Sequence, residues 1–523
     1  MKIKLFSIIS LLSLGAYTAS AQDPIDIFNV SQTNFSSYTA RSAAMGGAFT
    51  ALGADGASAS INPAGIGMYR TNDIGMTGSV LAIKANSTTS GALGNYQSSA
   101  KETTVPLNNI TAMFNVYNSK SGSVRAINIG FAYNQMQNYS YKQYTTGNFT
   151  QGSMADLFAA KLYDVNPKDI LSSSSDPLGV YREASASFWG PMMAYNTGLL
   201  YVTNDQPYKY TLSSGDNGTL FLGDEVYPEL SYNNTGRKGD YAFTAGFNLI
   251  DKIYIGATLA YQDYQYSKYQ LYSEFANVKN NAGDLDLYDY SQQLTTTGDG
   301  FSFKFGITAE PIKGLKLAVA VHAPTIYNIK DEYYADMTSY FTSGSVRSLS
   351  ASTPYFLSEY KVHTPTVFLA GISYVLGKTA IVSFDYDRTF YNKMKVANGL
   401  GQAGRQSLNA SIADNYQAVN NFRAGAEFRF LGVGYLRAGY AYYGNPLKNE
   451  SSTENVWHNI SGGIGVKAGV FYCDLTYVNM HTKTSSQYFY HEDFGNNNVI
   501  KSDQIFSNKI TRHSIMLSAG CKF

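Results

Sequence analysis

RSAAMGGAFTALGADGASASINPAGIGMYR, residues 41–70, is the stretch that decides the fold. About two thirds of residues 42–67 are Gly, Ala or Ser, which supply too little apolar bulk to build a core of their own. Asp55 is placed to cap a short helical turn, and Pro63 ends that turn because it pushes Asn62 out of the helical region. The stretch predicts a compact segment packed inside a larger structure; a flexible Gly-rich linker is the alternative.

The N-terminus has the features of a secretory signal peptide over residues 1–21. Lys2 and Lys4 precede an apolar run that is too short to cross a bilayer, and small residues form a cleavage site. We expect the mature chain to start at Gln22. Removing the two lysines leaves 37 of 39 basic groups against 38 acidic groups, a net charge near −1. This balance suggests no nucleic-acid partner.

The composition points to a membrane barrel, although the mean hydropathy is only −0.20. The chain has 44 Tyr, 29 Phe and 47 Gly but 13 Pro, and only 15% of its residues are charged, against about a quarter in soluble domains. A barrel strand faces lipid and lumen in turn, so its average hydropathy is mild. We therefore predict an all-β fold: a transmembrane antiparallel β-barrel with an N-terminal plug.

Period-two alternation supports this fold from residue 73 onward. Large apolar residues alternate with small or polar ones in segments long enough to span an outer membrane, and about 14 such segments can be counted. The chain ends with the same alternation from Ile515 to Phe523, an apolar face closed by an aromatic residue. We expect Phe523 to serve as the signal that barrel assembly machinery reads.

Short turns alternate with long connections, as expected for periplasmic turns and extracellular loops. The long connections are expected near 267–297, 330–361, 392–417 and 480–507, with a still longer insert at about 145–228. That insert is either a cover for the barrel mouth or an apolar funnel that captures ligand. The candidate capture residues are Phe188, Trp189, Tyr195, Leu199 and Leu200.

Charged residues inside the strands should face the lumen, because a charge facing lipid near the bilayer midplane costs about 2–4 kcal/mol. They form either a polar wall that holds the plug or a site for a carboxylate. The predicted wall consists of Lys304, Asp385, Arg423, Glu427, Arg437 and Asp474.

No motif indicates catalysis, so we expect no enzyme, no cofactor and no metal. His322 faces the lumen by register but is a weak signal alone. Cys473 and Cys521 are expected to be free, lipid-facing residues; a disulfide between neighbouring strands is the alternative.

With these features the chain resembles the FadL/TodX family of outer-membrane transporters for long-chain fatty acids and other hydrophobic compounds. The most specific match is residues 45–65, MGGAFTALGADGASASINPAG, which resembles the family's N-terminal hatch. The hatch motif residues are Met45, Gly46, Gly47, Asn62, Pro63 and Ala64. The resemblance implies a hatch at 22–72 and a 14-stranded barrel at 73–523.

The resemblance also implies a function in the outer membrane of a Gram-negative bacterium. Hydrophobic small molecules, fatty acids or hydrocarbons, would be captured outside, pass to an apolar pocket, and leave sideways through a kinked third strand after hatch movement. We expect a monomer that contacts outer-membrane lipid and the assembly machinery. No proline marks a kink between Val124 and Tyr144, so the sequence does not decide whether this chain has a lateral opening. The alternative function is a PorV-type barrel with a structural or secretion role and no lipid transport.

Overall fold

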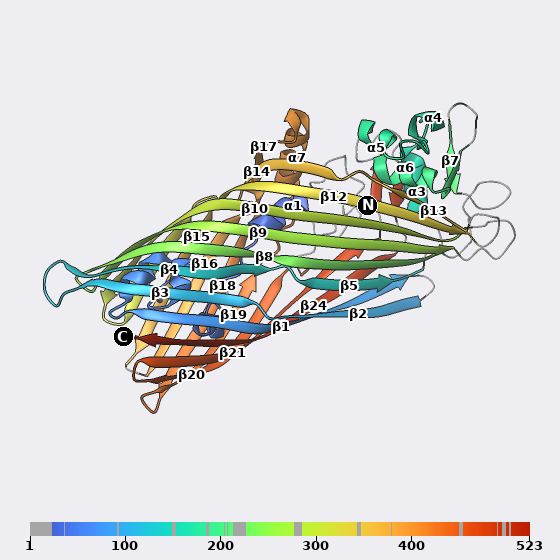
Figure 1. Ribbon diagram of the computed structural model, residues 1–523. Coiled ribbons are helices and arrows are strands. Elements are labelled where there is room, and N and C mark those ends of the chain that lie inside the picture. The colour runs from blue at the N-terminus through green and yellow to red at the C-terminus, as the bar shows by residue number, and fades with distance from the viewer. Residues whose placement is uncertain are drawn as a thin grey trace, which may run out of the picture.

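The computed structural model is a closed antiparallel barrel of 14 strands with the N-terminal segment inside it (Figure 1). It describes residues 24–523 except 36, 92–93, 149–152, 185–187, 203, 205, 207, 213–225, 277–284, 342–346, 378, 449–452, 489, 494–497 and 502–503. The expected signal peptide therefore lies outside the described residues. Among the described helices, none is both long and apolar enough to cross a membrane.

The barrel wall is built mostly from hairpin-connected neighbours. Its strands are β1 (Asp73–Gly91), β2 (Gly94–Thr104), β3 (Leu107–Asn118), β4 (Val124–Asn138), β5 (Tyr141–Thr146), β8 (Val226–Leu249), β9 (Ile253–Ala276), β10 (Leu285–Ile312), β11 (Leu315–His322), β12 (Ile326–Phe341), β14 (Phe356–His363), β15 (Val367–Leu376), β16 (Ala380–Phe390), β18 (Ala418–Phe430), β19 (Gly434–Tyr443), β20 (Trp457–Ala468), β21 (Phe471–Gln487) and β24 (Ile505–Lys522). The pairs β2/β3, β4/β5, β11/β12 and β14/β15 each form one interrupted strand of the barrel. The predicted number of strands is confirmed.

The first and last strands close the barrel. β1 pairs with β24 over its whole length, from Asp73 opposite Lys522 to Ser90 opposite Ile505. Beyond this ladder, Asn72 and Phe523 exchange both backbone hydrogen bonds, at 2.8 and 3.1 Å. Closure leaves no free sheet edge there.

The predicted alternation of inward and outward residues is confirmed in the wall. On β8, Phe243 is 63% exposed on the outer face while Ala242 is fully buried. Aromatic rings of neighbouring strands also meet in a row: Tyr241 lies 6.1 Å from Tyr261, which lies 5.7 Å from Phe301. Such rows mark the border of the lipid-facing band in membrane barrels.

The prediction of long loops at these positions was largely wrong. β9, β10 and β12 continue far into the 267–297 and 330–361 regions, and β21 runs to Gln487. The strands continue because, beyond the lipid band, the outward face need not be apolar, and polar residues there do not end a strand. The remaining elements at this end are β13 (Ser348–Ser352), η4 (Tyr391–Lys393), β17 (Lys395–Asn398), α7 (Gly401–Asn415), β22 (Tyr490–Asp493) and β23 (Asn498–Lys501).

The insert between β5 and β8 folds as a small helical cap at the end of the barrel opposite the short turns (Figure 1). It contains α3 (Met154–Lys161), α4 (Pro167–Ile170), α5 (Gly179–Glu183), α6 (Trp189–Asn196), β6 (Leu200–Val202) and β7 (Tyr210–Leu212). Its buried side chains share one apolar cluster with residues of β9, β10 and β12. The cap is therefore packed onto the extended strands.

Removing Phe523 should impair barrel assembly, because the backbone exchange with Asn72 and the terminal aromatic are both lost. The fraction of protein that shows the heat-dependent shift in electrophoretic mobility of a folded barrel should fall. Phe471→Ala, which removes a similarly exposed aromatic ring from the adjacent strand, is the control and should assemble normally. Equal assembly of both variants and the wild type would remove Phe523 from this role.

Candidate functional site

The N-terminal segment crosses the lumen as a chain of short helical turns. These are α1 (Pro24–Ser31), α2 (Ala40–Ala44), η1 (Gly56–Ala59) and η2 (Pro63–Met68). As predicted, the Asp55 side chain caps η1, and Asn62 leaves the helical region before Pro63. Asn62 is itself the cap of η2. We call residues 24–69 the plug.

Asn62 also ties the plug to itself and to the wall. Its side-chain nitrogen donates to the Thr50 carbonyl oxygen at 2.6 Å and to Thr308 Oγ1 of β10 at 3.2 Å, and its oxygen accepts from the Ala64 N–H at 3.1 Å. Gly306 of β10 faces this amide, and a Cβ there would collide with Asn62 Oδ1. The contact between the fully buried Asn62 and the wall therefore requires both the side-chain amide of Asn62 and a glycine at position 306.

The other hatch motif residues pack against the wall by close backbone approach. Met45 is fully buried, and Gly46 adopts a left-handed φ of 66°. A Cβ on Gly439 of β19 would collide with the Gly46 nitrogen and with Met45. The small residues on both sides are what let the two backbones touch.

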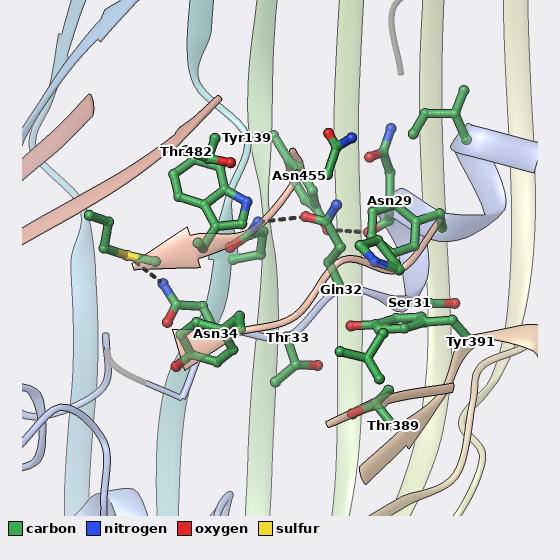
Figure 2. A pocket seen from close by; sticks show the side chains of 18 of the residues that line it. Asn29, Ser31, Gln32, Thr33, Asn34, Tyr139, Thr389, Tyr391, Asn455 and Thr482 are labelled. Atoms are coloured by element: carbon green, nitrogen blue, oxygen red, sulfur yellow. Dashed lines mark hydrogen bonds between the residues drawn. The ribbon is translucent and has the colours of Figure 1, made fainter. Parts of the chain in front are cut away.

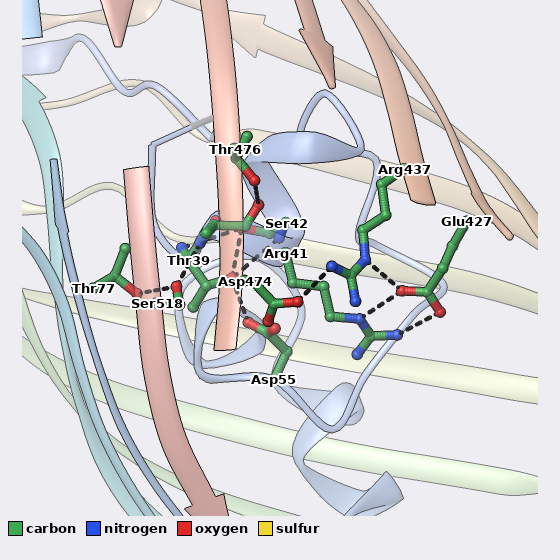
Figure 3. Close-up of polar contacts among 11 residues, drawn as sticks. Thr39, Arg41, Ser42, Asp55, Thr77, Glu427, Arg437, Asp474, Thr476 and Ser518 are labelled. Atoms are coloured by element: carbon green, nitrogen blue, oxygen red, sulfur yellow. Dashed lines mark hydrogen bonds and ion pairs between the residues drawn. The ribbon is translucent and has the colours of Figure 1, made fainter. Parts of the chain in front are cut away.

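The first ion network joins the plug to β18, β19 and β21 (Figure 3). Glu427 accepts from Arg41 of the plug at 3.1 Å and from Arg437 at 2.7 Å, and Arg437 reaches Asp474 at 2.6 Å. Burial alone would lower the pKa of Arg41, but the neighbouring Glu427 charge raises that pKa above its ordinary value. The network thus joins three residues of the predicted polar wall, Glu427, Arg437 and Asp474, to Arg41, a plug residue that the sequence analysis did not assign.

The second network centres on Arg423, which is fully buried. Its guanidinium pairs with Asp387 and lies 3.7 Å from Asp385. Asp385 in turn accepts from the Thr50 N–H at 2.8 Å and from the Thr50 hydroxyl at 2.7 Å. Phe35 of the plug covers the guanidinium, with its ring centroid at 4.9 Å.

The third network joins β8 and β10 to the plug. Lys304 is ion-paired with Asp240, and the Ser60 hydroxyl also donates to Asp240. Nearby, His322 Nε2 lies 2.8 Å from the Ile61 carbonyl oxygen. Three wall carboxylates, Asp240, Asp385 and Glu427, thus each bind one point of the plug.

These contacts bear on the two interpretations of the lumen charges, a wall that holds the plug and a site for a carboxylate. Arg423 and Arg437 each face two wall carboxylates, so neither has a free charge to offer to a ligand carboxylate. Asp240 and Asp387 were missed, although each shares its strand face with residues already assigned to the lumen, Ala242 and Asp385. The arrangement supports the structural reading of a wall that holds the plug.

A cavity of about 240 Å³ lies in the lumen beside the first residues of the plug (Figure 2). Residues 25–35, from α1 to the segment that follows it, form one side of it. The opposite sides come from the barrel wall and are mainly aromatic and apolar with amides and hydroxyls between them. Representative wall residues are Tyr139, Tyr266, Tyr391, Val419, Trp457, Met480 and Ile510.

Arg512 of β24 lines this cavity and was not assigned from the sequence. Its guanidinium lies over the Trp457 ring, 5.0 Å from the centroid, and its Nε is buried without a hydrogen-bond partner. Within the described residues no carboxylate forms an ion pair with it. Asp26 and Lys268 also line the cavity. Arg512 thus differs from Arg423 and Arg437, whose charges are neutralised. The alternation along β24 places Arg512 on the same inward face as Ser514 and Ser518, and this pattern could have identified it as a lumen residue.

The wall is not continuously paired next to this cavity. β2 pairs with β1 down to Thr104, and the ladder between β3 and β4 starts only at Asn109 opposite Asn134. In the part of the chain that is described, no backbone ladder joins β2 to β4 or β5. Side chains bridge the two edges instead: the Ser98 hydroxyl donates to the Tyr144 carbonyl oxygen at 2.5 Å.

Pro106 lies at the break between β2 and β3, where it cannot donate to a ladder, and the pairing register of β1 shifts between Thr77 and Gly78. The third barrel strand is interrupted as well, between Asn138 of β4 and Tyr141 of β5. We call this unpaired region between β2 and β4/β5 the wall gap. Its proline is on the second strand, which is why a search of the third strand alone missed it.

A second cavity of about 50 Å³ lies behind the wall gap. It is lined by Pro106, Asn108 and Gln135 from the strands that border the gap. It shares Asn34, Gln137, Met480 and Arg512 with the larger cavity. The two cavities are therefore adjacent and together point from the lumen toward the gap.

The candidate capture residues are mostly not available at the surface. Trp189, Leu199 and Leu200 are buried in the apolar cluster of the cap, whereas Phe188 is exposed and Tyr195 is half-buried. The Trp189 ring packs edge-on against Phe356 of β14 at 5.9 Å. This burial favours a cover packed on the barrel over an exposed capture surface.

The structure also places the two cysteines. Cys473 and Cys521 are free, and Cys473 faces Ala519 across the ladder rather than Cys521. Among the described residues, no group of three or more His, Cys, Asp or Glu is arranged to hold a metal ion.

Asn62→Ala should loosen the plug, because it leaves the Thr50 carbonyl, Thr308 and the Ala64 N–H without this partner, at a cost of about 1–3 kcal/mol. We expect faster proteolysis within the plug, measured by limited digestion and mass spectrometry, with normal barrel assembly. The exposed Asn118→Ala serves as the control. Identical digestion of the two variants would show that Asn62 does not hold the plug.

No protein-family model and no curated protein matches this sequence. Solved structures do match. A Pseudomonas aeruginosa FadL homologue aligns over 92% of this chain and 98% of its own, with 10% identity and a TM-score of 0.50. The deltaS2 mutant of the TodX monoaromatic hydrocarbon channel aligns over 94% and 100%, with 11% identity and a TM-score of 0.50. The chain thus has the fold of the FadL and TodX channels.

Proposed function

We propose that the chain is a channel, rather than an enzyme, for passive uptake of hydrophobic compounds, long-chain fatty acids among them, across the outer membrane of a Gram-negative bacterium. The observation that carries this proposal is the lumenal cavity next to the wall gap, lined by Arg512, whose Nε has no hydrogen-bond partner among the described residues. The similarity to a FadL homologue and to a monoaromatic hydrocarbon channel agrees with it.

The route follows from the cost of exposing apolar chains to water. Each methylene group gains about 0.8 kcal/mol on leaving water, so a compound that crosses an aqueous pore loses that energy again. A cavity lined by Tyr266, Trp457 and Ile510 offers an apolar surface, and the wall gap leads sideways from it. The compound enters from the capped end, occupies the cavity, and leaves through the gap into the bilayer.

The two parts of the plug have different roles in this proposal. Residues 40–69 are bound by the three wall carboxylates and form the static block of the lumen. Residues 25–35 line the cavity and are held by hydrogen bonds rather than by those carboxylates: Gln137 donates to Gln32 at 2.8 Å, and the buried Lys238 Nζ donates to the Val30 and Gln32 carbonyl oxygens. Movement of residues 25–35 is therefore the smallest change that would open the route.

The charge of Arg512 favours an amphiphile with a carboxylate head over a neutral hydrocarbon. A charge-assisted hydrogen bond is stronger than a neutral one, and Arg512 lacks a protein carboxylate in the described residues. The cavity volume is below the roughly 300 Å³ of typical ligand pockets. It would hold the head and first methylenes of a long chain, whose tail would extend toward the wall gap.

The experiment that tests uptake uses Gram-negative cells that lack their own fatty-acid transporter. Labelled oleate is supplied with and without this chain in the outer membrane, and assembly is verified in each strain. Rescue of uptake is the expected result. Normal assembly without uptake of oleate or of toluene would contradict the proposal and favour a PorV-type scaffold.

Arg512→Gln should lower oleate uptake about ten-fold, equivalent to about 1.4 kcal/mol, and leave uptake of the neutral alcohol of equal chain length unchanged. The ratio of the two rates is the readout, because it cancels differences in expression. Arg429→Gln is the matched control, because Arg429 is exposed near the end of β18, where its side chain donates to the Gly432 carbonyl oxygen. An equal loss for both compounds would show that Arg512 does not select the carboxylate.

A further inference from the structure

A row of four lysines runs across the outer face of the barrel. Lys101, Lys84, Lys509 and Lys483 lie on the neighbouring strands β2, β1, β24 and β21, and all four are exposed. Lys84 is directly opposite Lys101, and Lys483 is directly opposite Lys509. Lys84 and Lys509 are diagonal neighbours, because Lys509 faces Asn86. The lysine row is thus continuous over four strands.

This arrangement is unfavourable without an anion. Like charges directly opposite each other on neighbouring strands destabilise a sheet, and the lysine row contains two such pairs. Among the described residues, no carboxylate forms an ion pair with any of the four. Glu102 is ion-paired with Lys142, at 2.6 Å, and Glu454 accepts from Ser485 at 2.7 Å.

The opposite wall is built differently. There Lys330 forms an ion pair with Glu332 at 3.0 Å and lies opposite Glu359 on the next strand. At that position carboxylates neutralise the outward lysine, in contrast to the lysine row on β2, β1, β24 and β21.

The lysine row stands just beyond the lipid-facing band. On β24 the outward residues run from Lys509 through Thr511 and His513 to Ile515 and Leu517, which are 55% and 52% exposed. On the next strand the Tyr477 hydroxyl lies 2.7 Å from His513 Nδ1. A polar aromatic level therefore separates the apolar band from the lysines, as at a membrane–water interface. Long lysine side chains reach headgroups from such a position.

We propose that the lysine row binds the phosphate groups of a phosphorylated glycolipid in the outer leaflet. The proposal rests on the outer-membrane placement proposed above. Phosphate supplies the negative charge that would neutralise the four ammonium groups, and lysine binds phosphate as a point charge. Because β1 and β2 border the wall gap, the bound lipid lies beside the proposed exit.

The test measures lipid binding to the purified full-length barrel in detergent by native mass spectrometry. The probes are diphosphorylated lipid A and its fully dephosphorylated form. The variant carries Lys84→Gln, Lys101→Gln, Lys483→Gln and Lys509→Gln. A matched control removes the same net charge elsewhere through Lys252→Gln, Lys313→Gln, Lys330→Gln and Lys361→Gln, all at exposed positions.

Wild type and control should bind diphosphorylated lipid A at least ten-fold more tightly than the four-lysine variant, and the dephosphorylated form should bind weakly to all three. Raising the salt concentration should narrow the difference. Replacing the same four lysines with arginine should preserve binding, which separates charge from folding. Equal affinity of the four-lysine variant and the wild type, or equal binding of both lipids, would overturn the proposal. Uptake is not part of the readout, so this outcome is independent of the transport test.

Discussion

The structure depends on one constraint: the plug fills the barrel lumen, so its backbone polar groups are buried there. A plug made of small residues exposes many N–H and C=O groups, and each must find a partner away from water. Asp240, Asp385 and Glu427 supply charged acceptors at three points of the wall, and each is neutralised by a wall cation. Removing one partner of such a pair leaves an uncompensated buried charge, so the wall and the plug hold each other in place.

The same constraint divides the lumen into two regions. Where the wall carboxylates act, plug and wall touch through backbone and the interior is closed. Beside residues 25–35 a cavity remains, lined by Arg512, and the buried Lys238 donates to the carbonyl oxygens of Val30 and Gln32. The wall gap opens on this second region. In the proposed function, separate parts of one lumen therefore hold the plug and pass the ligand, and a ligand would not have to displace the ion networks to cross it.

Much of the fold could be predicted because a barrel strand repeats every two residues. Strand number and the facing of strand residues follow from local alternation, and the Asp55 cap and the break at Asn62-Pro63 follow from turn chemistry. The ion pairs between plug and wall could not be predicted from the sequence, because Arg41 and Glu427 are 386 residues apart and only the closed barrel brings them together. The long loops were wrongly predicted because strand residues beyond the lipid band are polar on their outward face, and such a sequence resembles that of a loop. The wall gap was not predicted because its proline, Pro106, lies on the second barrel strand and not on the third, where a kink was expected.

The central claim is that a carboxylate amphiphile sits at Arg512 with its chain directed toward the wall gap. Anomalous diffraction from crystals of the barrel grown with a fatty acid brominated at its far end tests it most directly. The account predicts ligand density with the carboxylate on the Arg512 guanidinium and the bromine peak toward Pro106 and Gln135. A bromine peak only outside the barrel, or an empty cavity at saturating ligand, would contradict it.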